Sequence, residues 1–147
     1  MLKHEALQHA LMADVQPELM AVYQALQTAV IADGKTMDDL VAFTSSGMHD
    51  ANDPTNNIFW SVQFNRRPVH PAGRDPSIEN CLELTFYYPP ASSFFSMVYI
   101  AGQNRFELVA SAVYPAWIWS HTVQMATQFA AMTPSDIISA GGYRVYK

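Results

Sequence analysis

The first third of the chain repeats apolar residues at the spacing of a helix. The positions that follow the 3.6-residue period are Leu19, Tyr23, Leu26 and Val30. We expect this helix to begin near Pro17, because a proline fits the first helical turn, and to end at Gly34, a residue common at helix C-termini. The pattern predicts a shorter helix around residues 2–13 before it.

Residues 36–45 carry the signature of a further helix start. Thr36 is followed three residues later by Asp39, which resembles a capping box with aspartate in place of glutamate. The sequence therefore predicts a short helix from Thr36 to about Ser45, with Leu40 and Phe43 buried.

From Asn57 the apolar period changes to two, which is typical of strands with one buried face. Ile58, Trp60, Val62 and Phe64 alternate with polar neighbours, and Leu82, Leu84, Phe86 and Tyr88 repeat the pattern. Two more strands are expected at 94–101 and 105–114, joined by the turn Ala101-Gly102-Gln103-Asn104. These segments predict a four-stranded antiparallel meander.

Two helices are predicted after the strands. One runs from Pro115 to about Met132, and the next begins at Thr133-Pro134 and stops at Gly141-Gly142. Residues 143–146 either add a strand or lie across the sheet. The order predicts one α+β domain over 1–147, a two-layer fold in which N-terminal and C-terminal helices pack on one face of the four-stranded sheet.

Charge is scarce and unevenly placed along the chain. Only 14% of the 147 residues are charged, and residues 1–55 hold eight acids and two bases of a chain whose net charge is −5. A nucleic-acid surface needs a basic stripe, so this class of partner is not expected. The acidic N-terminal helices leave open an inhibitor or accessory protein for a basic partner.

A membrane span is not expected either. The longest uncharged stretch, 108–135, is interrupted by Pro115 and by several polar residues, whereas a span needs about 20 predominantly apolar residues. The N-terminus lacks the apolar region of a signal peptide. Because the single Cys81 cannot form an internal disulfide, the sequence favours a cytoplasmic protein.

A basic segment rich in proline joins the first two predicted strands. The stretch Asn65–Asn80 is expected to be a loop of about 16 residues, which is longer than most. It carries four residues that suit a carboxylate or phosphate ligand: Arg66, Arg67, His70 and Arg74. The sequence predicts either an anion site or a solvated loop whose arginines balance the acidic helices.

Aromatic residues stand next to one another in the predicted strands, in the pairs Phe59-Trp60, Tyr87-Tyr88 and Phe94-Phe95. Neighbours on a strand point to opposite faces, so one ring of each pair must leave the covered face of a two-layer domain. The second face is therefore an interface with another copy or the lining of an apolar pocket. The residues assigned to it are Phe59, Tyr87, Phe94, Trp117 and Trp119.

No motif in the chain specifies catalysis. His4 and His9 miss the i, i+4 spacing of a zinc helix, and the residues after Asp50 do not complete a calcium loop. The leading hypothesis is a non-enzymatic interaction or small-ligand-binding domain, a homodimer with a possible small apolar or anionic ligand, and with no assigned cofactor, metal or catalytic residue. The enzyme alternative is a small-molecule cleft that draws on His49, Asp50, His70, Cys81 or His121.

Overall fold

A computed structural model describes residues 3–49, 52–53, 55, 57–70, 73, 75–91, 93–110, 119–140 and 143–147. The helices are α1 (Lys3–Ala32), α2 (Trp119–Ala131) and α3 (Pro134–Ala140). The strands are β1 (Leu40–His49), β2 (Ile58–Val69), β3 (Ser77–Tyr88), β4 (Ser93–Ile100), β5 (Arg105–Ala110) and β6 (Val145–Tyr146). Two 3-10 turns flank β4, η2 (Pro89–Ala91) and η3 (Ala101–Gln103).

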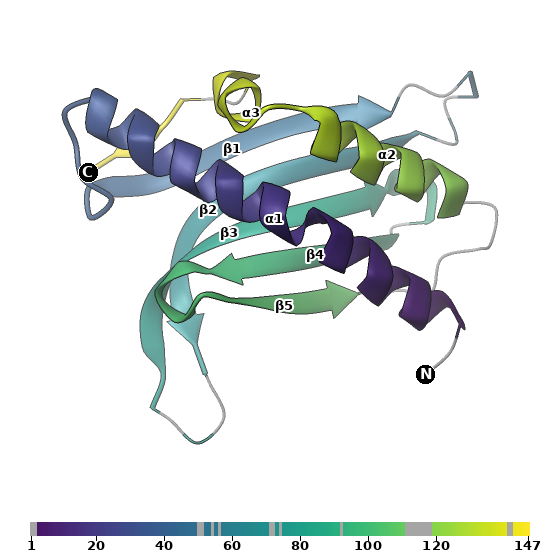
Figure 1. Ribbon diagram of the computed structural model, residues 1–147, viewed down its shortest axis with the longest axis horizontal. Coiled ribbons are helices and arrows are strands. Elements are labelled where there is room, and N and C mark those ends of the chain that lie inside the picture. Colours follow the sequence, from purple (N-terminus) through teal and green to yellow (C-terminus); the bar gives the residue numbers. More distant parts are fainter. Residues whose placement is uncertain are drawn as a thin grey trace.

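The strands form one antiparallel sheet in the order β5-β4-β3-β2-β1-β6. β1 to β5 are a meander, and β6 returns to pair with β1 at the other edge. All three helices lie across the same face of this sheet (Figure 1). The predicted α+β class with an antiparallel sheet is confirmed, although the described sheet has six strands rather than four.

The core lies between the helices and the sheet. The predicted apolar stripe of α1 faces this core, and three of its fully buried residues are Leu19, Leu26 and Val30. α2 adds Phe129, whose ring meets the indole of Trp60 edge to face, with centroids 5.7 Å apart. The other face of the sheet carries no helix among the described residues (Figure 1).

The prediction of two separate N-terminal helices is wrong, because α1 continues through Pro17. An internal proline loses a helical hydrogen bond and costs about 3 kcal/mol. Val15 and Leu19, on either side of it, are buried in the core, and this burial offsets the cost. The predicted end at Gly34 is confirmed: its φ is 75°, and its N–H donates to Ile31 while that of Lys35 donates to Val30.

The predicted helix over 36–45 is also wrong. The Asp39 carboxylate does accept a hydrogen bond from the Thr36 N–H at 3.0 Å, as in a capping box, but strand β1 follows from Leu40. A register shift between Leu40 and Ala42 places Leu40 and Phe43 on the buried side of one strand. This bulge gives a strand the i, i+3 spacing that otherwise indicates a helix.

The predicted 16-residue loop is wrong as well. β2 and β3 remain paired from Asn65↔Cys81 to Val69↔Ser77, so Arg66 and Arg67 belong to a strand. The resulting hairpin reaches well past the helical layer in Figure 1. The sequence shows no alternation of apolar and polar residues here, because Arg66, Arg67 and Pro68 follow one another and place no large apolar side chain on either face.

Candidate functional site

The uncovered face of the sheet presents a row of large apolar side chains. The register places four residues side by side on adjacent strands β1 to β4: Met48, Phe59, Tyr87 and Phe94. Met48 is 44% exposed, and Phe59 and Tyr87 are each 39% exposed. We call these four residues the aromatic row. Phe59 and Tyr87 face away from the helices, as strand alternation predicts.

A second row, of small hydroxyl side chains, runs beside the aromatic row. The paired positions on β1 to β4 are Ser46, Ser61, Thr85 and Ser96. The difference in side-chain size between the two rows leaves a hollow of about 380 Å³, whose lining includes Phe59, Tyr87, Ser61 and Thr85. Its walls are mostly carbon, so this hollow suits an apolar group.

The end of this face that is farthest from the aromatic row carries two ion pairs. Arg67 pairs with Glu83 at 3.4 Å, and Arg105 pairs with Glu107 at 2.7 Å. Cys81 is fully buried on this face in a small apolar cluster with Val69, Val98 and Ile100. Burial raises the pKa of the Cys81 thiol and outweighs the opposing effect of Arg67. The thiol therefore stays protonated, which is unfavourable for a nucleophile.

The structure does not bring Arg66 and Arg67 of the predicted anion site together. Arg66 points to the helical side of β2, where its Nε donates to Asn80 Oδ1 at 3.0 Å and its Nη2 donates to the Met37 carbonyl. Arg67 lies on the uncovered face. His70 is exposed just beyond β2, and Arg74 lies outside the described residues.

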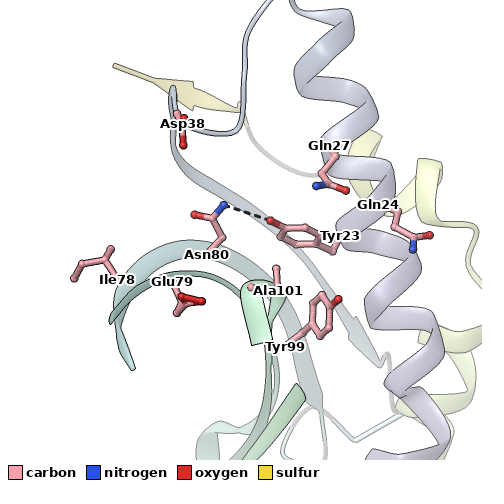
Figure 2. Close-up of a pocket in the computed structure, with 10 residues that line it drawn as sticks. Tyr23, Gln24, Gln27, Asp38, Ile78, Glu79, Asn80, Tyr99 and Ala101 are labelled. Carbon is pink, nitrogen blue, oxygen red and sulfur yellow. Dashed lines mark hydrogen bonds between the residues drawn. The ribbon is translucent and has the colours of Figure 1, made fainter. Parts of the chain in front are cut away.

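A polar pocket of about 520 Å³ lies where α1 meets the first residues of β3 and the turn η3. Figure 2 shows Tyr23 at its centre, with the phenol directed at Asn80, whose Nδ2 donates to the Tyr23 Oη at 3.4 Å. Tyr23 also contacts Tyr99 edge to face, with centroids 5.5 Å apart. Burial raises the pKa of the Tyr23 hydroxyl, against the effect of the Asn80 hydrogen bond. Gln24, Gln27, Asp38 and Glu79 complete the polar lining.

Sequence reasoning missed the polar pocket. Tyr23 and Asn80 are 57 positions apart, and Arg66 reaches Met37 across 29 positions. The sequence pattern places Tyr23 only in the apolar stripe of α1. No local pattern links these residues, because the contacts depend on how α1 crosses the sheet.

Several predicted residues have no described side-chain environment. Asp50 and Trp117 lie outside the described residues, as do the side chains of His49 and Trp119. His121 lies on α2, in the helical layer, whereas Cys81 lies on the opposite face of the sheet. The structure therefore does not join these two candidates in one cleft.

The described residues contain no group of three or more His, Cys, Asp or Glu side chains that would hold a metal ion. Among the described helices, none combines the length and apolar character needed to cross a membrane. Comparisons of the chain with models of known protein families, with characterised proteins and with solved structures found no match.

Proposed function

We propose that this domain acts by association, as a homodimer in which the uncovered sheet faces of two copies pack together. The observation that carries the proposal is the aromatic row. Its members Met48, Phe59 and Tyr87 are exposed on a face that no described element covers. Aromatic residues and methionine are enriched at protein interfaces, and burying them against a second copy removes apolar area from water.

Charge on this face favours a second copy as the partner. Arg67 and Arg105 stand beside Glu83 and Glu107, so these four side chains cancel, although the whole chain carries −5. In a two-fold contact each copy presents the same surface, so arginines of one can meet glutamates of the other. These two ion pairs add no net charge to the face, so they add no repulsion between two acidic chains.

The size of the face agrees with a dimer. Five strands at about 4.8 Å spacing and about nine residues at roughly 3.3 Å each give a face of about 24 by 30 Å, or roughly 700 Å². Stable protein interfaces bury about 800 Å² per partner. Two such faces therefore supply nearly the area of an ordinary interface.

An apolar small ligand is a second candidate for the same face, supported by the hollow beside the aromatic row. The ligand would fill a volume of about 380 Å³, which is within the usual range for small-molecule sites. The enzyme alternative has less support, because Cys81 and His121 lie on opposite sides of the sheet.

Charge substitutions locate the interface. Tyr87→Lys puts an ammonium group into the aromatic row, and Ile31→Lys is the matched control, since Ile31 is 71% exposed on α1 in the helical layer. We expect sedimentation velocity to show dimers for the wild type and for the control, but monomers for Tyr87→Lys, with circular dichroism unchanged. Dissociation by the control, or an intact Tyr87→Lys dimer, would place the interface elsewhere. A monomeric wild type would leave the apolar-ligand candidate.

A further inference from the structure

Met48 brings a thioether into the aromatic row. It lies near the end of β1, opposite Phe59 in the register with β2, and it is 44% exposed. Among the methionines with a described side chain it is the most exposed, since Met97 and Met125 are buried and the others are partly covered by the core. An oxidant in solution can therefore reach the sulfur of Met48 in the free chain.

Hydrogen peroxide converts such a thioether into a sulfoxide. One peroxide oxygen forms a bond to the sulfur as the O–O bond breaks, the sulfur loses two electrons, and the other oxygen leaves as water with both hydrogens. The reaction turns a flexible apolar side chain into a polar one. Because susceptibility follows exposure, Met48 is the described methionine that should react first, and the fully buried thiol of Cys81 should be spared.

We propose that Met48 is an oxidation site and that its sulfoxide weakens the homodimer, an inference that rests on the proposed association through the uncovered face. In the free chain, water hydrates the sulfoxide oxygen, and packing the aromatic row against a second copy removes this water. Ser46, two positions earlier on the same face, has a single hydroxyl hydrogen to offer in its place. A two-fold dimer contains Met48 twice, so the cost of burying the polar group also occurs twice.

Association in turn protects Met48. While two copies are packed together its sulfur is covered, so peroxide reacts with the dissociated chain. The rate of sulfoxide formation at Met48 should therefore fall severalfold as the protein concentration rises above the dissociation constant of the dimer. Mass spectrometry of the methionine-containing peptides measures this rate for each site, and a rate that does not depend on protein concentration would overturn the inference.

The main test treats the wild type and Met48→Leu with hydrogen peroxide and follows their association by sedimentation velocity. Leucine keeps the apolar volume without the sulfur, so Met48→Leu is the matched control. Oxidation should raise the dissociation constant of the wild-type dimer at least about tenfold and leave that of Met48→Leu unchanged. Reduction by two methionine sulfoxide reductases, one for each epimer of the sulfoxide, should restore the wild-type dimer.

Two results of this test would overturn the inference and leave the homodimer standing. One is a wild type that is fully oxidised at Met48 and keeps its dissociation constant. The other is an equal loss of association by the peroxide-treated Met48→Leu, which would place the effect at another methionine. A wild type that is monomeric before peroxide is added would instead refute the proposed homodimer itself.

Discussion

Replacing Gly47 with alanine tests the packing of β1 against β2. Gly47 pairs with Trp60 in the register, and the indole occupies the space above the glycine. An alanine Cβ would lie 2.4 Å from the indole Nε1 and 2.6 Å from Cε2. Trp60 is 5% exposed and contacts the ring of Phe129. The indole therefore has little room to move away from the new methyl group.

The sign of the stability change shows whether Gly47 stands at an open strand position or against a packed core. At an open strand position, glycine to alanine stabilises by roughly 0.5–1 kcal/mol. Overpacking a core costs about 1–3 kcal/mol, so we expect Gly47→Ala to destabilise by about 2 kcal/mol. With an unfolding entropy of about 2.1 cal/mol/K per residue, this corresponds to a fall of about 6 °C in Tm for the 147 residues.

A double-mutant cycle with Trp60→Phe isolates the contact. The smaller ring leaves space for the alanine methyl, so the cost of Gly47→Ala should fall by at least about 1 kcal/mol in the Trp60→Phe background. Urea unfolding of the four proteins gives the coupling free energy. A stabilising Gly47→Ala, or an equal cost in both backgrounds, would refute the placement of residues 40–49 as a strand beside Trp60.

Two further predictions concern single groups. Cys81 is fully buried with a raised pKa, so a thiol reagent such as DTNB should label it only after unfolding; fast stoichiometric labelling of the native protein would contradict this. Hydrogen bonds from Arg144 and Tyr146 lower the pKa of Asp33 from 3.8 to about 2. The stability from this group is full above pH 3.8 and is lost as the pH falls through about 2. Thermal unfolding between about pH 2 and 7 should therefore show that Asp33→Asn loses less stability at acid pH than the wild type or Asp136→Asn. The same dependence of Tm on pH in all three proteins would argue against the contact.

Strands with unbroken alternation could be predicted from the sequence. Ile58, Trp60, Val62 and Phe64 repeat with a period of two, and all four are buried in β2. β1 could not, since the register shift between Leu40 and Ala42 hides its alternation, and its partner β2 lies further along the chain. Pairing between distant segments outweighed the local helix signal at Thr36 and Asp39.

Of the two candidate sites, the uncovered face could be predicted from the sequence and the polar pocket could not. Alternation alone places Phe59 and Tyr87 on the face away from the helices. The polar pocket depends on the crossing of α1 over the sheet, which brings Tyr23 to Asn80. Arg66 and Arg67 are adjacent in sequence, yet the strand sends them to opposite faces. Proximity in sequence was therefore a poor guide to a shared ligand.

The central claim, association through the uncovered sheet face, is tested most directly by the mass of the wild-type protein in solution. Sedimentation equilibrium over a range of micromolar concentrations should give about twice the 16.4 kDa of one chain. A mass of 16.4 kDa that persists at hundreds of micromolar would contradict the homodimer.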